Sequence, residues 1–156
     1  MIRIKTTDGW ILLGHKDHAN LAGAFADAWD GTRFPKPVPT ASVLKAVFHH
    51  DDSWEERDND GYITSEGLPS AFTKELVGTY DAFEEIELVD YLNVRAGATE
   101  NMAKEDPYAA ILISMHTVNL LTEQADLSTL NAEESRIHGA FIDGQIKRQK
   151  ELAERY

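Results

Sequence analysis

The stretch of sequence that decides the fold is residues 106–121, which read DPYAAILISMHTVNLL. Asp106 followed by Pro107 is typical of a helix start, because aspartate caps the first turn and proline lacks an N–H that this turn would leave unbonded. The residues that follow are apolar on nearly every side of a helix, which predicts a buried central helix. His116 lies within it, so we expect a buried imidazole there. These features favour a mainly helical fold.

The length and composition of the chain exclude several classes of protein. The chain has 156 residues, with 15 Lys and Arg against 27 Asp and Glu, a formal net charge of −12 and no cysteine. This length predicts a single domain over residues 1–156. The acidic excess argues against a nucleic-acid partner, because backbone phosphates are bound by clustered lysine and arginine. Without cysteine, histidine and carboxylates remain as ligands for a metal ion.

Apolar runs bear on the location of the protein. No run of about 18 apolar residues occurs, so we expect neither a membrane-spanning helix nor a membrane partner. The N-terminal stretch MIRIKTTDGWILLGHK lacks the uninterrupted apolar core and the cleavage site of a secretory signal. We therefore expect a cytoplasmic protein.

A short β-hairpin is predicted at the N-terminus. Ile2 and Ile4 alternate with polar residues, the dipeptide Asp8-Gly9 is typical of a tight turn, and residues 10–13 form an apolar return strand. Further helices are expected over residues 17–29, 40–52, 80–96 and from about 131 to the end, with mostly loop at 53–79 and 97–105.

Polar residues mark the starts of two of these helices. Thr40 follows a proline-rich connection and is the expected N-cap of the second helix. Asn131 is the expected N-cap of the last helix, and Glu134, three residues on, would complete a capping box. His138 lies on this amphipathic last helix, where we expect it at the surface.

Helical periodicity sorts the six histidines by direction. On the first helix, steps of four and three residues place His18 on one face with Ala22, Phe25 and Trp29. We therefore expect His18 to point to the core. His15 precedes this helix, and periodicity sets no direction for it.

The adjacent histidines His49 and His50 are expected to point in opposite directions. His50 shares a helix face with Val47 and Trp54, which predicts an inward side chain, whereas His49 falls on the polar face. Asp51 follows at the helix end, where the helix dipole disfavours a carboxylate. A nearby cation is expected to compensate its charge.

Together, His18, His50, His116 and Asp51 predict a metal cluster contributed by three helices. Imidazole nitrogen and carboxylate oxygen suit Zn, Mn, Fe or Ni, and carboxylate oxygen also suits Mg. Metal binding would offset the cost of burying these groups. For each histidine alone, the commoner alternative is a core side chain hydrogen-bonded to a carbonyl. The prediction of a metal site therefore depends on the four residues occurring together.

Four segments of the chain carry a family resemblance: DHANLAG at 17–23, AVFHHDDSW at 46–54, GLPSAF at 67–72 and PYAAILISMHTVNLL at 107–121. They resemble the HD-domain superfamily, whose helical members bind metal through a histidine, a His-Asp doublet and a later aspartate. More closely, the sequence is similar to an uncharacterised bacterial family with HD-like features, domain of unknown function 3891. The resemblance implies an HD-domain-like helical bundle with His18, His50 and Asp51 as metal ligands and His116 as a further one.

The chain differs from the HD pattern near its C-terminal end. HD proteins supply a final aspartate ligand from a late helix, and here the last helix contains only Asp143. Either His116 replaces that ligand, or the chain lacks the family's C-terminal helices, or another subunit of a homo-oligomer completes the site. Ser53 stands where the family usually has glycine, which is a minor difference.

The resemblance implies metal-dependent hydrolysis of a small phosphoester or nucleotide, because a bound dication lowers the pKa of water and polarises a phosphoryl oxygen. Two alternatives stay open: a di-iron oxygenase that uses the same ligands, and a non-catalytic binding module that the metal stabilises. Asp52 and Asp58 are the candidate catalytic residues, which would orient the water or carry its proton. The candidates for substrate binding are Lys16, Arg33, Arg57 and Trp54.

Overall fold

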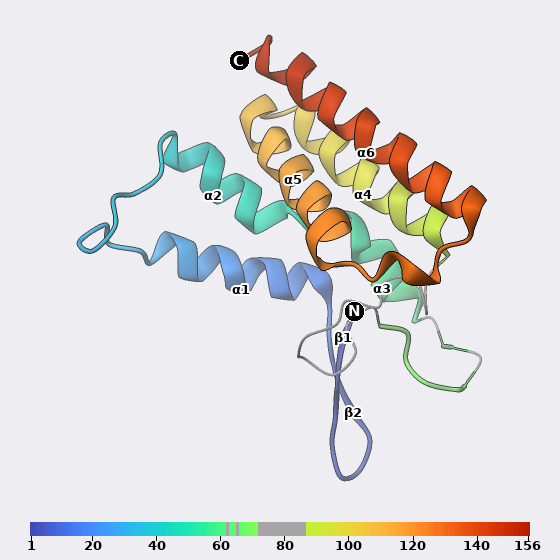
Figure 1. Cartoon of the computed structure of the whole chain (residues 1–156). Helices are drawn as coiled ribbons and strands as arrows, with labels where there is room; N and C mark the ends of the chain where they lie inside the picture. The colour runs from blue at the N-terminus through green and yellow to red at the C-terminus, as the bar shows by residue number, and fades with distance from the viewer. Residues whose placement is uncertain (62, 65, 72–86) are drawn as a thin grey trace.

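The computed structural model describes residues 1–61, 63–64, 66–71 and 87–156. The chain is mainly helical with a two-stranded N-terminal hairpin, as predicted (Figure 1). Among the described residues, no helix combines the length and the apolar composition needed to cross a membrane. The elements are β1 (Ile2–Lys5), β2 (Trp10–Leu13), α1 (His15–Asp27), α2 (Thr40–His49), the 3₁₀ turn η1 (Asp52–Trp54), α3 (Glu55–Asp60), α4 (Leu88–Ala103), α5 (Pro107–Asn119), the π-helical turn η2 (Leu120–Gln124), the 3₁₀ turn η3 (Leu127–Thr129) and α6 (Ala132–Ala153).

The N-terminal hairpin is built as the sequence predicts. β1 and β2 are antiparallel, with Ile2 opposite Leu13. A hydrogen bond of 2.9 Å from the Thr6 N–H to the Gly9 carbonyl closes the turn. Gly9 has a φ angle of 153°. Residues with a Cβ rarely adopt this conformation, which explains the glycine at the turn.

α1 and α2 form a helical hairpin that extends from the rest of the molecule as an arm (Figure 1). The close approach of these helices depends on Gly23, where an added Cβ would lie 2.3–2.5 Å from ring atoms of Phe48. α1 buries its small residues Ala19 and Gly23 and leaves Phe25 70% exposed. The expected inward face containing His18 is therefore wrong, and His18 is exposed. Large side chains do not fit where two helices approach this closely.

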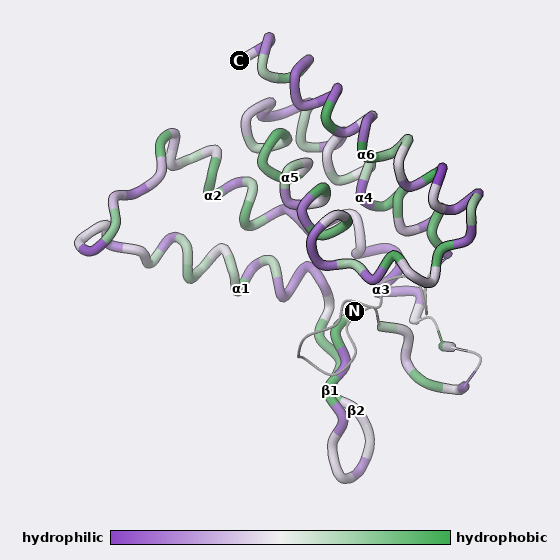
Figure 2. The backbone as a smooth tube through the Cα atoms, in the orientation of Figure 1, coloured by the Kyte–Doolittle hydropathy of each residue, from purple (hydrophilic) through white to green (hydrophobic). Residues whose placement is uncertain are grey.

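α4, α5 and α6 form the body of the molecule. α5 packs against α4, α6 and α2, so it is the central helix that the sequence predicts. Its buried residues include Ala109, Ala110 and Ile113. The expectation that His116 is buried is wrong, because solvent reaches α5 on the side toward α2. Figure 2 shows hydrophilic and hydrophobic residues alternating along α6, as expected for a helix with one buried face.

A polar seam, made of Thr99, Ser114, Gln145 and Gln149, runs through the contact between α4, α5 and α6. The Gln145 Oε1 atom accepts hydrogen bonds from the Ser114 hydroxyl at 2.6 Å and the Thr99 hydroxyl at 3.4 Å. The Gln149 Nε2 atom donates to the Ser114 hydroxyl at 3.0 Å. Thr99, Ser114 and Gln145 are buried, so these hydrogen bonds satisfy polar groups that water cannot reach.

Two predicted helix starts are confirmed and one is wrong. The Asp106 side chain accepts a backbone hydrogen bond of 3.0 Å from the first turn of α5. Asn131 and Glu134 form the predicted capping box of α6. The N-cap of α2 is Pro39, however, and Thr40 is the first helical residue. The Thr40 hydroxyl donates backward to a carbonyl of the proline-rich connection, so it does not cap the helix.

Helix boundaries differ from expectation in the middle of the chain. α4 continues to Ala103, so residues 97–103 are helical rather than loop. Ala98 and Met102 extend its buried face, and this packing outweighs the weak helix propensity of Gly97. η1 and α3 are helical within the expected loop, and α2 ends at His49. Residues 62, 65 and 72–79 of that loop, and residues 80–86 of the expected helix, lie outside the described residues.

Candidate metal centre

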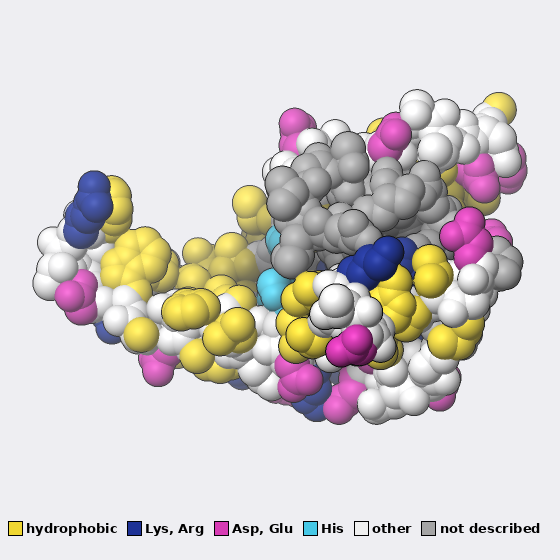
Figure 3. Space-filling view, turned by 90° about the horizontal axis from the view of Figure 1, so that it is seen from below, with side chains coloured by type: hydrophobic (Ala, Val, Ile, Leu, Met, Phe, Trp, Pro, Cys, Tyr) yellow, Lys and Arg dark blue, Asp and Glu magenta, His cyan; other side chains and the backbone are white. Residues whose placement is uncertain are grey.

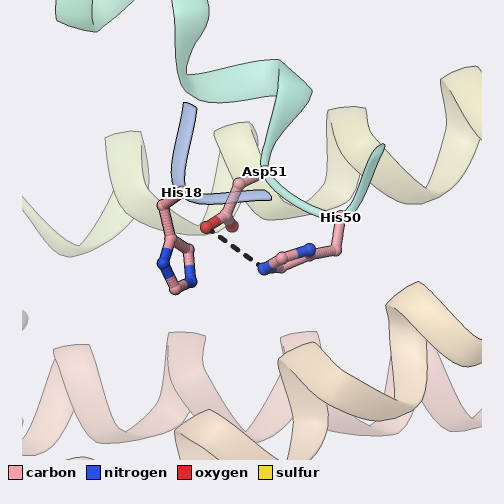
Figure 4. A group of neighbouring side chains, drawn as sticks. All are labelled: His18, His50 and Asp51. Atoms are coloured by element: carbon pink, nitrogen blue, oxygen red, sulfur yellow. Dashed lines mark ion pairs between the residues drawn. The ribbon is translucent and has the colours of Figure 1, made fainter. Parts of the chain in front are cut away.

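The structure brings His18, His50 and Asp51 together from α1 and the end of α2 (Figure 4). One ligand atom from each residue lies within 4.8 Å of the others. Figure 4 shows both imidazole rings beside the Asp51 carboxylate, with the Nε2 atom of His50 3.4 Å from Oδ2 of Asp51. These residues are three of the four predicted ligands. In the sequence His18 lies 32 residues before the adjacent His50 and Asp51, and the pairing of α1 with α2 brings the three together.

The hydrogen bonding of His50 leaves one ring nitrogen for a ligand. Its Nδ1 atom lies 2.8 Å from the Val47 carbonyl oxygen. A carbonyl oxygen only accepts hydrogen bonds, so this contact assigns the ring proton to Nδ1 and the lone pair to Nε2. The Nε2 lone pair then faces the Asp51 carboxylate, which is also an acceptor. A cation between two facing acceptors relieves their repulsion, so the donor set fits a metal ion.

Arg95 on α4 holds the second oxygen of Asp51. Its Nη1 atom donates to Oδ1 at 2.7 Å, and both residues are buried. Burial raises the pKa of Asp51, but the positive charge of Arg95, with smaller contributions from nearby histidines, outweighs it and keeps the pKa below its usual value. Asp51 is therefore a carboxylate with Oδ2 directed to the imidazole rings.

Further contacts fix the Arg95 guanidinium in place. Its Nε atom donates to the Tyr91 hydroxyl at 3.1 Å, and its carbon Cζ lies 5.4 Å from the centre of the Trp54 ring. Sequence reasoning expected a compensating cation near Asp51 but did not identify this arginine. A signal was present, because Arg95 shares a helical face with Tyr91 and Leu92. An arginine on a buried face requires a carboxylate partner.

His116 on α5 stands beside this group of three ligands. Its ring centre lies 5.1 Å from that of His50, which in turn lies 5.7 Å from that of His18. Although His116 is solvent-accessible, the protein atoms packed around its ring reduce the hydration of the charged form, and together with repulsion from Arg95 and His50 they lower the pKa of His116 to about 4. The imidazole is therefore neutral at pH 7, which is the form that binds metal.

A second polar group joins α3 to the start of α1. Asp58 accepts hydrogen bonds from the His15 backbone N–H at 2.6 Å and from its Nδ1 atom at 2.9 Å, and also contacts the Met1 amino group at 2.6 Å. Burial raises the pKa of Asp58, but the hydrogen bonds from His15 and Met1 outweigh it and lower the pKa to about 2. His15 is 1% exposed, so its side chain points into the protein. Helical periodicity had predicted no direction for it. Burial also lowers the pKa of His15.

The other predicted catalytic residue, Asp52, pairs with His49. Its Oδ2 atom lies 2.7 Å from Nδ1 of His49, and both side chains are partly exposed. The opposite directions predicted for His49 and His50 are confirmed, with side-chain exposures of 47% and 13%. Neither Asp52 nor Asp58 belongs to the three-residue ligand group found among the described residues.

The predicted substrate-binding residues have partners of their own. Lys16 pairs with Glu55 through contacts of 2.7 and 2.8 Å on the surface. Trp54 is 1% exposed and packs against other rings of the interior. The Arg57 Nη2 atom lies 3.4 Å from the Ser70 hydroxyl, and Arg33 stacks on its neighbour Phe34.

Two predictions concern α6. Asp143, the only aspartate of the last helix, is exposed. His138 was expected at the surface, but it is buried, and its Nε2 atom lies 3.1 Å from the Leu121 carbonyl oxygen. The π-helical turn η2 begins at Leu120, so this histidine satisfies a carbonyl at an irregular helix end.

The fold and the site define a helical protein with a candidate metal centre between its arm and its body. A family model described as "Protein of unknown function (DUF3891)" matches residues 1–156, so the chain belongs to that family. This confirms the predicted resemblance to that uncharacterised family. No curated protein and no solved structure matches the chain.

Proposed function

We propose that the protein binds a divalent metal ion through His18, His50 and Asp51 and hydrolyses a small phosphoester or nucleotide at that ion. The observation that carries the proposal is the convergence of the three ligand atoms within 4.8 Å of one another. The HD-like resemblance of the sequence adds the reaction class. His116 on α5, whose ring centre lies 5.1 Å from that of His50, offers a further donor from another helix.

The donor set favours a transition metal. Two imidazole nitrogens and one carboxylate oxygen suit Zn, Mn, Fe and Ni, and they suit Mg less well because this ion prefers oxygen ligands. A bound dication supplies Lewis-acid polarisation of a phosphoryl oxygen and a water of lowered pKa. Arg95 and the Val47 carbonyl act on the ligands, since one fixes the Asp51 carboxylate and the other fixes the His50 ring.

Exposure of the site supports catalysis over a purely structural role. His18 is exposed, His50 is partly exposed and Asp51 is buried, so solvent reaches the ligand group from the side of the two histidines. Structural zinc sites are closed by four protein ligands, whereas catalytic sites use three and leave a position for water or substrate. His18, His50 and Asp51 match the second arrangement.

The first experiment measures metal content and affinity. Elemental analysis of protein purified without added metal is expected to give one divalent ion per chain, and isothermal titration calorimetry of the metal-free protein gives the affinities for Zn²⁺ and Mn²⁺. His50→Ala is expected to lower the affinity by more than the roughly 10–100-fold loss typical of outer-shell changes. His49→Ala is the matched control, because the neighbouring His49 points to solvent and pairs with Asp52. Equal metal binding by the two variants would contradict the proposed site.

Turnover is then measured on metal-loaded protein. We expect release of phosphate from phosphomonoesters or nucleotides, lost in His50→Ala and retained in His49→Ala. If metal binds without turnover and unfolding becomes metal-dependent, the result favours the non-catalytic module instead.

A second candidate function rests on the same donor set. Two histidines and one carboxylate with open positions are also the ligands of non-haem iron oxygenases. His116, whose ring centre lies 5.1 Å from that of His50, would offer a donor to a second iron. Iron near two per chain, together with substrate-dependent oxygen consumption, would favour the oxygenase over the hydrolase.

A further inference from the structure

A pocket of about 260 Å³ lies between α2 and α5, next to the candidate metal centre. On α2 its lining begins at Val43 and ends at His50, and on α5 it ends at His116. The lining residues of α2 and those of α5 come together where the rings of His50 and His116 are in contact. The pocket therefore has a polar end at the ligands. The full lining is Val43, Ala46, Val47, His50, Leu112, Ile113 and His116.

The walls of this pocket are neutral and apolar. Apart from the two histidines, the lining residues are alanine, valine, leucine and isoleucine, and none carries a charge. A nucleotide would place its ribose and further phosphates against walls that offer them no charged partner. An apolar group would gain from leaving water in the same space.

The volume suits a group of modest size. An engineered apolar cavity of roughly 150 Å³ binds benzene, so about 260 Å³ holds an aromatic ring with a substituent or a branched alkyl chain. Figure 3 shows histidine side chains at the molecular surface, next to a hydrophobic area that continues along the arm. The surroundings of the site therefore also favour an apolar ligand.

We infer that the substrate is a phosphomonoester of an aromatic or branched alkyl alcohol, with its phosphate at His18, His50 and Asp51 and its apolar group in the pocket between α2 and α5. This inference rests on the proposed function and specifies its substrate class. Hydrolysis forms a P–O bond to the oxygen of water, breaks the P–O bond to the alcohol and moves a water proton to the leaving alkoxide. The products are the free alcohol and inorganic phosphate.

Binding of two phosphonates tests the inference without relying on turnover. Phenylphosphonate and methylphosphonate share a metal-binding head whose C–P bond is not hydrolysed, and they differ in the apolar group. By calorimetry on Zn²⁺-loaded protein, we expect phenylphosphonate to bind at least about tenfold more tightly. Adenosine monophosphate is expected to bind more weakly than phenylphosphonate.

Substitutions in the pocket locate the apolar group. Val43→Phe fills the end of the pocket away from the ligands and is expected to remove the preference for phenylphosphonate. Val89→Phe is the matched control, because Val89 is 50% exposed on α4 and outside the lining. Val43→Thr keeps the shape of the side chain but replaces a methyl group with a hydroxyl, so it should also weaken phenylphosphonate binding. It serves as the second variant if Val43→Phe does not fold.

The outcomes separate this inference from the proposed function. Equal affinity for the two phosphonates, tighter binding of adenosine monophosphate, or a preference that survives both Val43 substitutions would overturn the pocket assignment while metal binding stands. Failure of the wild-type protein to bind Zn²⁺ or Mn²⁺ would overturn the metal site, and the substrate class with it.

Discussion

Arg95 of α4 and Asp51 at the end of α2 form a buried ion pair, with 2.7 Å between Nη1 and Oδ1. The two residues are 2% and 4% exposed. This pair joins the body of the molecule to the residue at the centre of the ligand group. It also keeps the Asp51 carboxylate charged in a buried position where an unpaired charge is costly. α4 thus supports a site to which it contributes no ligand.

Replacing Arg95 with methionine is expected to destabilise the metal-free protein by about 3–5 kcal/mol, because Asp51 is left buried without its partner charge. Urea denaturation measures this loss. Arg148→Met is the matched control, since its pair with Glu100 is partly exposed, and its loss should stay below about 1 kcal/mol. The double variant Arg95→Met/Asp51→Asn is expected to recover part of the stability. A double variant less stable than Arg95→Met alone would contradict the assignment.

Acid is expected to weaken the contact between α3 and the start of α1. The pKa of Asp58 is about 2 in the folded protein and 3.8 as its ordinary value, so the unfolded chain binds the proton first. The contribution of Asp58 to stability is therefore complete above pH 4 and is lost as the pH falls toward 2, by about 2 kcal/mol in total. Denaturation at a series of pH values should show this slope for the wild type and a flatter one for Asp58→Asn. The exposed Asp143→Asn variant should keep the wild-type profile.

His116 is expected to titrate far below an ordinary histidine. Nuclear magnetic resonance of the metal-free protein should give a midpoint near pH 4 instead of the ordinary 6.5. Because the folded pKa is the lower one, His116 reduces stability as the pH falls from 6.5 toward 4. Arg95→Met should raise the midpoint, since it removes a repelling charge. A midpoint near 6.5 in the wild type would show that the ring is more hydrated than the structure indicates.

Two glycine substitutions are expected to have opposite effects on stability. Gly23→Ala should destabilise the protein by about 1–3 kcal/mol, because its Cβ would overlap the Phe48 ring and separate α1 from α2. Gly144→Ala in α6 meets no atom within 4 Å and should stabilise it by about 0.5–1 kcal/mol through helix propensity. Thermal denaturation of both variants measures the difference. A loss of metal affinity in Gly23→Ala would follow from the same displacement, since His18 lies on α1.

Local signals in the sequence predicted local structure well. The hairpin turn at Gly9, the start of α5 at Asp106 and the capping box of α6 depend on a few adjacent residues, so the sequence contains their determinants. The inward direction of His50 was also predicted correctly, although Trp54, placed on the same helix face by the sequence pattern, lies in η1 beyond the end of α2.

Contacts between residues far apart in the sequence could not be predicted from such local signals. Hydrophobic periodicity selected the large side chains of α1 as its inward face, whereas the contact with α2 is made through Gly23 and needs small ones. His18 still reaches the ligand group, from an exposed position rather than from the core. Arg95 and Asp51 are 44 residues apart in the sequence. The sequence showed only that Arg95 is a charged residue on an otherwise apolar helix face, and it did not identify Asp51 as its partner.

The polar seam between α4, α5 and α6 sets the register of the body. Moving α6 by one residue would rotate Gln145 by about 100° and withdraw it from Ser114 and Thr99. Each buried polar group left without a partner costs roughly 1–3 kcal/mol, so shifted alignments that keep the apolar contacts are still rejected. The seam therefore selects one alignment of α6 against α4 and α5, and replacing Gln145 with leucine would keep the helical body but remove the hydrogen bonds that select this alignment.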